Sequence, residues 1–246
     1  MMFNTLISDL RELRLTGMAA AVQQQMEQPS YSEYSFEQRL GMLVTEERNH
    51  RNNRRLQRLL KEAKFKNPNA NVATIDYGTS RGLDKGQMQS LITCDWVRQG
   101  QPLLITGATG CGKTWLSCAL GIQCCSKGFS VLYRRMPRLI EEFEIAHGDG
   151  SLVALRQKLA KADLLIIDDW GLKPMSQLGR NDLMEIIEDR VGVSSVLIAA
   201  QLPTEQWHDY IGEPMVADAI LDRLLNGSHR ISLRGESMRK VRTKSG

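Results

Sequence analysis

Residues 107–114 read Gly107-Ala108-Thr109-Gly110-Cys111-Gly112-Lys113-Thr114, which fits the pattern G-x-x-x-x-G-K-[ST] at every fixed position. The apolar run at residues 102–106 predicts a buried strand before this stretch, and residues 115–122 predict a helix after it. This is the context of a phosphate-binding loop, because glycine lets the backbone curl around an anion and the helix amides point at it. The alternative, a glycine-rich turn with a chance lysine, leaves the flanking strand and helix unexplained.

The side chains of the loop predict how ATP and Mg²⁺ would be held. We expect Lys113 to reach the β- and γ-phosphates and the Thr114 hydroxyl to hold Mg²⁺. The backbone of the loop and of the first helical turn would cradle the remaining phosphate oxygens. The residues expected to bind the cofactor are Gly107, Ala108, Thr109, Gly110, Cys111, Gly112, Lys113, Thr114 and Trp115.

Two carboxylates, Asp168 and Asp169, follow four apolar residues that predict a strand buried on both faces. Carboxylates at the tip of such a strand are costly unless they face a cation or water. We assign Asp168 to Mg²⁺, mostly through water, and Asp169 to orienting and polarising the attacking water. Capping of the next turn is the alternative for Asp169. Gln201 ends the following strand and would bond the γ-phosphate and this water if the strands are neighbours; an ordinary loop residue is its alternative.

The order of these elements predicts the fold class. Strands are expected at residues 102–106, 130–135, 164–169 and 195–201, with helices between them. Strands that alternate with helices indicate a three-layer α/β domain with a parallel sheet and with ligands at the carboxyl ends of the strands.

The N-terminal part of the chain predicts helices only. Residues 4–26 have helical spacing of apolar side chains, and Ser35-Phe36-Glu37-Gln38 is a capping box that starts a second helix running on, or restarting, through residues 48–65. Residues 67–71 have the composition of a linker. We therefore expect a small all-helical domain over residues 1–67 and the ATPase domain over residues 68–246.

The second helix carries a ridge of basic side chains at i, i+3, i+4 and i+7, on a face separate from its leucines. Clustered positive charge indicates a polyanionic partner, whereas a solvated helix face is the alternative. The C-terminal end of the strand at 130–135 adds a second basic pair. The residues expected to contact duplex DNA, with little base specificity, are Arg51, Arg54, Arg55, Arg58, Arg134 and Arg135.

Arg223 is a candidate arginine finger, a cation that often arrives from a neighbouring subunit and cancels charge in the transition state. A salt bridge with Asp222 or Asp218 is the alternative. A finger supplied by a neighbour would make the active species a homo-oligomer.

The composition sets limits on the other function classes. The chain has 246 residues with a net charge of +4, and its apolar runs are all far shorter than the roughly 20 residues that span a bilayer. The N-terminus lacks the pattern of a signal peptide. The five cysteines form no C-x-x-C pair, which argues against zinc and favours a reducing, cytoplasmic location.

With these features placed, the chain resembles the AAA+ ATPases and, within them, the IstB family of transposition helper proteins, relatives of the DnaC and DnaI helicase loaders. The segments that carry the resemblance are residues 13–18, 35–40, 76–77, 81–84, 107–114, 168–171, 201–203, 207–208, 217–224 and 235–239. The resemblance implies that Asp169 stands where many AAA+ proteins have Glu and that Gln201 lies near the sensor-1 position, which is often Ser, Thr or Asn. It also implies Arg223 as the finger and Arg239 as a late sensor.

Four functions compete at this point. The first is an ATPase that binds and assembles on duplex DNA in an ATP-dependent manner and regulates or recruits a transposase. The second is a replicative helicase loader on the same fold. The third is a P-loop kinase for a small metabolite, which would not need an arginine ridge, and the fourth is a binding module with structural ATP. ATPase activity stimulated by DNA would separate the first two from the last two.

Overall fold

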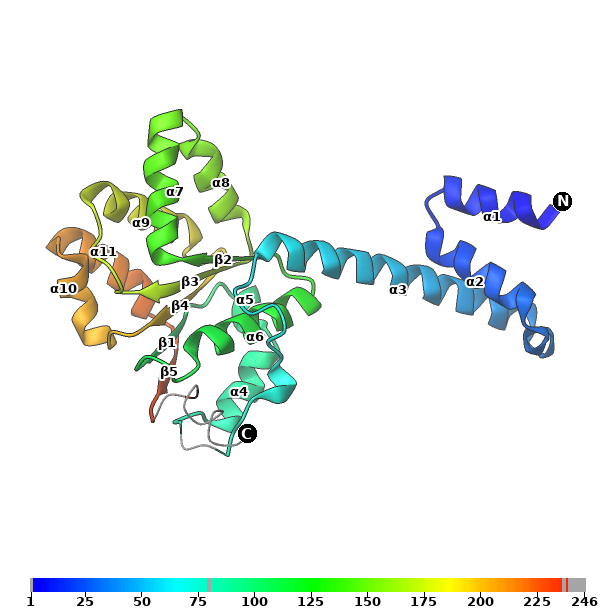
Figure 1. The fold of residues 1–246 in the computed structure, drawn as a ribbon, viewed down its shortest axis with the longest axis horizontal. Helices are drawn as coiled ribbons and strands as arrows, with labels where there is room; N and C mark the ends of the chain where they lie inside the picture. Colours follow the sequence, from blue (N-terminus) through cyan, green and yellow to red (C-terminus); the bar gives the residue numbers. More distant parts are fainter. Residues whose placement is uncertain (1, 79–80, 236–237, 239–246) are drawn as a thin grey trace. The chain divides into compact units, whose positions relative to one another are not determined.

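A computed structural model describes residues 2–78, 81–235 and 238 of the chain. They form two compact units, Met1–Arg58 and Leu59–Gly246 (Figure 1). The division falls within one long helix, α3, so residues 59–67 pack with the second unit. None of the helices in the described ranges is long and apolar enough to cross a membrane.

The first unit is helical throughout. Its elements are α1 (Met2–Glu12), α2 (Thr16–Glu27), the 3-10 helix η1 (Pro29–Glu33) and the first part of α3 (Phe36–Ala63). The capping box that opens α3 is confirmed, since Ser35 N donates to Gln38 Oε1 (2.9 Å) and Gln38 N donates to Ser35 Oγ (3.3 Å). The single helix expected over residues 4–26 is wrong, because the chain breaks between α1 and α2, where Arg14 takes φ 60°.

The start of α2 is fixed by Glu47, a buried side chain of α3. Glu47 Oε2 accepts hydrogen bonds from the backbone N–H of Gly17 (2.8 Å) and of Met18 (3.1 Å), and Glu47 Oε1 accepts one from Arg51 Nε (2.6 Å). Gly17 is needed here, because a methyl group on it would lie 2.8 Å from the backbone of Glu46. Burial by itself would raise the pKa of Glu47, but the hydrogen bonds from Arg51, Met18 and Gly17 outweigh it and lower the pKa.

The second unit contains a five-stranded parallel sheet in the order β2-β3-β4-β1-β5. The strands are β1 (Leu103–Gly107), β2 (Val131–Arg135), β3 (Leu164–Trp170), β4 (Ser195–Ala200) and β5 (His229–Leu233). The α/β fold class with a parallel sheet is therefore confirmed, and all four expected strands are present. Only β5 was not expected from the sequence.

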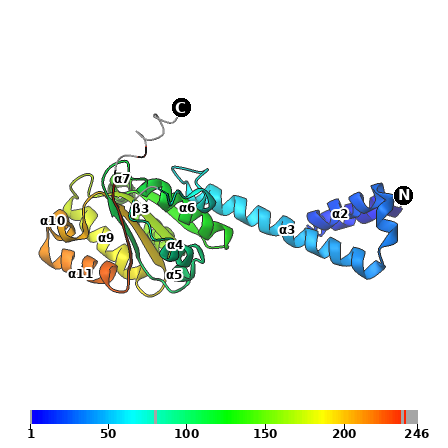
Figure 2. The ribbon, with the colours of Figure 1, turned by 90° about the horizontal axis from the view of Figure 1, so that it is seen from below.

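Helices cover both faces of this sheet (Figure 2). They are, with the short elements, η2 (Val72–Thr74), α4 (Lys85–Ile92), α5 (Asp95–Arg98), α6 (Lys113–Ser126), α7 (Met136–Asp149), α8 (Leu152–Lys161), α9 (Gln177–Arg190), η3 (Thr204–Gln206), α10 (Trp207–Ile211) and α11 (Pro214–Leu225). Helix α6 packs on one face, where Gly121 lies against Ile166, while α7 to α11 cover the other face in one continuous core with Leu165 and Ile167. Successive residues of β3 thus enter opposite layers.

The contacts of Glu47 predict the behaviour of the first unit. Glu47→Ala removes the cap of α2 and should destabilise this helix by about 1–2 kcal/mol. The measurement is amide hydrogen exchange in the full-length chain, where the amides of α2 should exchange faster. Because folding lowers the pKa of Glu47, its contribution is complete at neutral pH and is lost as the pH falls through the folded pKa.

The matched control is Glu46→Ala, one residue away on the exposed surface of the same helix. Equal exchange rates of the α2 amides in wild type and Glu47→Ala would show that Glu47 does not hold the start of α2.

Candidate nucleotide-binding site

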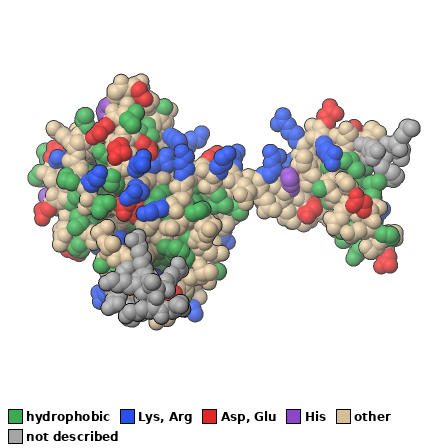
Figure 3. Space-filling view, in the orientation of Figure 1, with side chains coloured by type: hydrophobic (Ala, Val, Ile, Leu, Met, Phe, Trp, Pro, Cys, Tyr) green, Lys and Arg blue, Asp and Glu red, His purple; other side chains and the backbone are tan. Residues whose placement is uncertain are grey.

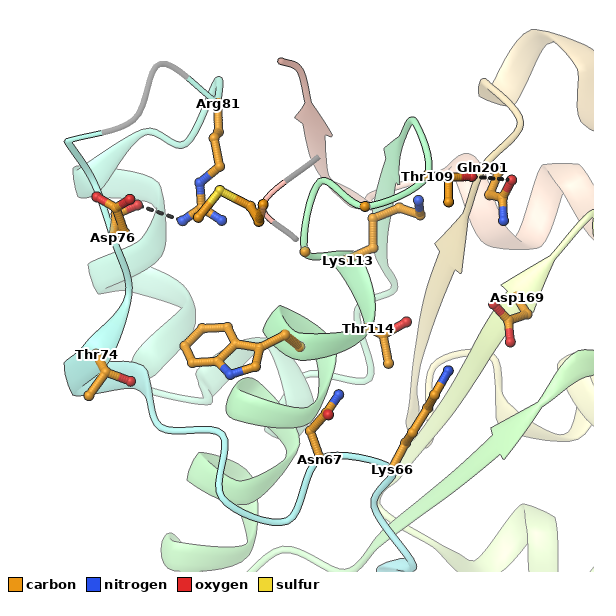
Figure 4. A pocket seen from close by; sticks show the side chains of 14 residues that line it. Lys66, Asn67, Thr74, Asp76, Arg81, Thr109, Lys113, Thr114, Asp169 and Gln201 are labelled. Carbon is orange, nitrogen blue, oxygen red and sulfur yellow. Dashed lines mark hydrogen bonds between the residues drawn. The ribbon is translucent and has the colours of Figure 1, made fainter. Parts of the chain in front are cut away.

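A pocket of about 330 Å³ lies at the carboxyl ends of the strands, around the glycine-rich loop between β1 and α6 (Figure 4). Thr109, Lys113 and Thr114 line it from this loop, and Asp169 and Gln201 line it from the ends of β3 and β4. Strands β3 and β4 are neighbours, as the expected role of Gln201 requires. The fold therefore brings the phosphate loop, a carboxylate and an amide together in one cavity.

The loop has the backbone that a phosphate site needs. Gly112 is the N-cap of α6 with φ 94°, a left-handed conformation that favours glycine. Lys113 folds back over the loop, where its Nζ donates to the carbonyl oxygens of Gly107 (2.7 Å) and Ala108 (2.9 Å). Burial lowers the pKa of Lys113, whereas Cys111 and Asp168 nearby oppose this shift.

Asp168 is buried, and its side chain accepts hydrogen bonds from two hydroxyl groups. Its Oδ2 accepts hydrogen bonds from Thr114 Oγ1 (2.7 Å) and from the phenol of Tyr133 (2.6 Å). Burial and the carboxylate together raise the pKa of Tyr133, so this phenol stays a donor. Tyr133, the residue before Arg134, thus holds the Asp168 side chain in position.

Asp169 reaches the pocket because β3 bulges. Its φ is 58°, and the pairing of β3 with β4 shifts register between Ile167 and Trp170. In a regular strand Asp169 would follow Ile167 into the core beneath α9, but the bulge sends Trp170 there instead, against Trp207 at 5.1 Å between ring centroids. Asp169 Oδ2 then accepts a hydrogen bond from Arg135 Nε at 2.5 Å, which raises the pKa of Arg135.

The hydroxyl and carboxylate of Thr114 and Asp168 fit Mg²⁺. They are oxygen donors in direct contact, at the end of the loop that would carry the phosphates, and Mg²⁺ usually takes one or two carboxylates with substrate phosphates and water. Among the described residues, no group of three or more His, Cys, Asp or Glu side chains is placed to hold a metal by itself. A cation here would therefore depend on the nucleotide for further ligands.

Gln201 contacts the loop directly, since Thr109 Oγ1 donates to its Oε1 at 2.9 Å. This bond joins the end of β4 to the phosphate loop after β1, its neighbour in the sheet. The Gln201 amide group lies across the pocket from Asp76, on the same side as Asp169 (Figure 4).

The expected arginine finger, Arg223, and two arginines expected to contact DNA, Arg134 and Arg135, do not line this cavity. Arg223 lies at the opposite end of β1, where it bonds Glu188 Oε1 (2.8 Å) rather than Asp222 or Asp218. Arg134 is buried and bonds Glu142 (3.0 Å), so its side chain is not presented to DNA, and Arg135 is occupied by Asp169. Arg239 lies outside the described residues.

The arginine ridge belongs to the first unit. Arg51, Arg54, Arg55 and Arg58 are all exposed, as the expected face requires. Arg51 nevertheless has a structural partner in Glu47, an acid that lies just before the basic run in the sequence. On the second unit, basic side chains also gather on the face seen in Figure 3.

Besides Met238, five residues that line the pocket were missed by sequence reasoning. They are Lys66, Asn67, Thr74, Asp76 and Arg81, all between the end of α3 and the start of α4. Asn67 lies in the stretch expected to be a linker, but it packs with the second unit. No local pattern marks these residues as ligands, because only the folding of this segment against α6 brings them to the phosphate loop.

Comparison with known proteins agrees with this geometry. The chain matches the family of IstB-like ATP binding proteins over residues 8–246. It belongs to this family. A protein of Sinorhizobium fredii named as an insertion sequence ATP-binding protein is 42% identical over 240 residues, which cover 98% of each chain. The corresponding protein of insertion sequence IS1162 from Pseudomonas fluorescens is 47% identical over 204 residues, covering 83% of this chain and 88% of that one.

Solved structures support the fold assignment of this IstB-like chain. The DnaC helicase loader aligns with a TM-score of 0.54 at 20% identity, over 68% of this chain and 97% of DnaC. DnaI aligns with a TM-score of 0.57 at 18% identity, over 72% of this chain and 94% of DnaI. The expected AAA+ fold is therefore confirmed, and so is the resemblance to the IstB family.

The pocket predicts the effect of removing its lysine. Lys113→Ala should weaken ATP binding about 100-fold, because a charged donor to the phosphates is lost. Calorimetric titration with ATP measures this change. Lys127→Ala, which removes an exposed lysine after the other end of α6, is the matched control. Unchanged affinity in Lys113→Ala would contradict the assignment of the phosphate loop.

Proposed function

We propose that this chain hydrolyses ATP and, in its ATP-bound form, assembles on duplex DNA to recruit or regulate a transposase. The observation that carries the proposal is the bulge in β3, which holds Asp169 at the pocket beside the phosphate loop. A protein that only stored ATP would have no need of a carboxylate held there in a rare backbone conformation. The relatives named for insertion sequences support the connection with transposition.

The residues divide the chemistry between them. Loop amides and Lys113 bind the phosphates, and Thr114 and Asp168 would hold Mg²⁺, which would neutralise charge on the phosphate oxygens. Asp169 orients the attacking water and accepts its proton, and Gln201 bonds this water and the terminal phosphate. Tyr133 keeps Asp168 in place through the 2.6 Å hydrogen bond to Oδ2.

Arg223 acts on the nucleotide of a neighbouring subunit. It lies at the end of β1 that is remote from its own phosphate loop, so it has no access to its own nucleotide. Its bond to Glu188 is on the surface, where both side chains are partly exposed and can exchange partners. A finger of this kind makes hydrolysis depend on assembly.

The alternative is a helicase loader, on the grounds of the DnaC and DnaI folds. A shared fold at this level of sequence identity does not show that this chain binds the same partner as DnaC or DnaI. Co-precipitation of the ATP-bound chain with a transposase encoded by the same insertion sequence, against a replicative helicase, separates the two. Capture of the helicase alone would favour the loader.

Asp169→Asn is the sharpest test of hydrolysis. The variant keeps the shape of the side chain and should bind ATP normally, while turnover falls about 10²-fold because the general base is lost. Steady-state phosphate release and ATP titration measure the two quantities. Arg135→Ala is the control, since it breaks the same ion pair but leaves the carboxylate. If Arg135→Ala loses as much turnover as Asp169→Asn, the loss is due to the broken ion pair and not to the missing general base.

The salt dependence of binding tests the DNA surface. Each phosphate contact that is lost should flatten the slope of log K against log[salt] by about 0.9. Because Arg51 holds Glu47, the variant replaces Arg54, Arg55 and Arg58 by Ala and keeps Arg51. It should weaken binding to two unrelated duplexes alike.

The control for this experiment replaces three exposed basic residues of the second unit, Lys85, Arg98 and Lys127. It removes the same charge and should keep the wild-type slope. An unchanged slope in the ridge variant would place the DNA surface elsewhere on the chain.

A further inference from the structure

Arg81 is a buried arginine in the wall of the nucleotide pocket, with a relative exposure of 7%. Its Nη2 donates to the carbonyl oxygen of Asp76 at 2.5 Å. In the described part of the chain its guanidinium thus bonds a neutral carbonyl group, and its buried Nε has no hydrogen-bond partner there. The guanidinium therefore carries a positive charge that a neutral carbonyl only partly offsets.

A buried charge of this kind is costly unless an anion lies close to it. Among the described residues, two other buried arginines of the second unit have more hydrogen-bond partners than Arg81. Arg134 is bound to the carboxylate of Glu142, and Arg190 bonds three backbone carbonyl groups, from Leu159, Ala160 and Ser195. Arg190 does not line the nucleotide pocket, whereas Arg81 does. The charge of Arg81 is therefore placed where an anionic ligand would be bound.

The position of Arg81 shows which part of a ligand it would meet. A methyl group on Gly112 would lie 3.2 Å from Arg81 Nη1, so the guanidinium stands against the loop at the N-cap of α6. The backbone amides at a helix start are the groups that bind phosphate. Arg81 approaches from the side of Thr74 and Asp76, away from Asp169 and Gln201, where the terminal phosphate would be cleaved (Figure 4).

The backbone around Arg81 holds this position. The carbonyl oxygen of Arg81 accepts a hydrogen bond from Arg234 N (2.9 Å), just beyond β5. Gly82 has φ 75°, and a methyl group on it would lie 2.7 Å from the carbonyl oxygen of Ser232. The segment is thus pressed against β5 at its carboxyl end, and the arginine is preorganised before any ligand arrives.

We propose that Arg81 is a second fixed cation of the nucleotide site, which binds a phosphate that ATP and ADP share, next to Gly112. This inference rests on the proposed nucleotide-binding function of the pocket. Lys113 covers the Gly107–Ala108 side of the loop and Arg81 covers the helix side, so the two cations flank the phosphate chain. Arg81 therefore contributes to affinity for both nucleotides and does not distinguish them.

The experiment titrates the full-length chain calorimetrically with MgATP, MgADP and inorganic tripolyphosphate, which has the phosphates but no nucleoside. Arg81→Gln keeps a donor for the Asp76 carbonyl and removes the charge. It should bind all three ligands about 10- to 100-fold more weakly, as expected for a charged hydrogen bond. Arg81→Lys restores the charge and should recover part of this loss for all three ligands.

Two comparison variants separate the phosphate from the nucleoside. Trp115→Ala removes the one aromatic side chain among the described residues lining the pocket, and its effect should be confined to ATP and ADP. Arg98→Ala removes an exposed arginine away from the pocket and should bind like wild type. Melting temperatures without ligand show whether each variant is folded, and Arg81→Met replaces Arg81→Gln if the glutamine variant is not.

Each outcome decides the question. Weaker tripolyphosphate binding in a folded neutral variant, partly recovered in Arg81→Lys, supports the inference. Weaker ATP and ADP binding with normal tripolyphosphate binding would assign Arg81 to the nucleoside and overturn it, as would equal affinities in the neutral variant and wild type. Failure of the wild-type chain to bind any of the three ligands would instead overturn the proposed function itself.

Discussion

The candidate site depends on one constraint, the bulge at the end of β3. Strand alternation would send Asp169 into the core and Trp170 toward the phosphate loop. That arrangement would bury a carboxylate among apolar side chains and take the Trp170 ring out of the core. The left-handed backbone of Asp169 reverses this order. Trp170 packs on Trp207 and Tyr210, and this aromatic contact holds the strained residue in place.

The same bulge organises the polar groups around it. Asp168 stays under Thr114 and Tyr133, where two hydroxyl donors satisfy one carboxylate oxygen, while Asp169 turns to Arg135. Two adjacent carboxylates therefore have different surroundings, one buried among neutral donors and one paired with a cation at the surface. This difference is consistent with the proposed function, in which the first would be a metal ligand and the second a general base.

Segments that are remote from the phosphate loop in the sequence complete the lining of the pocket. The stretch between α3 and α4 folds against α6 and places Asn67, Asp76 and Arg81 in the same pocket as Asp169 and Gln201. In the first unit Glu47 has a comparable role, because it caps α2 from α3 and also holds Arg51. A residue of the basic ridge therefore serves the internal structure of that unit as well as any partner.

The sequence by itself determined the glycine-rich loop with its flanking strand and helix, four of the five strands of the sheet, and the pairing of Asp168 with Thr114 in one site. These features follow from local patterns, namely glycine spacing, apolar runs and residues at strand ends. Only the tertiary structure decided that Arg134 is buried, that Arg135 binds Asp169, and that Arg81 enters the pocket. Those outcomes depend on which strands become neighbours and where a bulge changes the direction of a side chain, and neither is encoded within a short window of the chain.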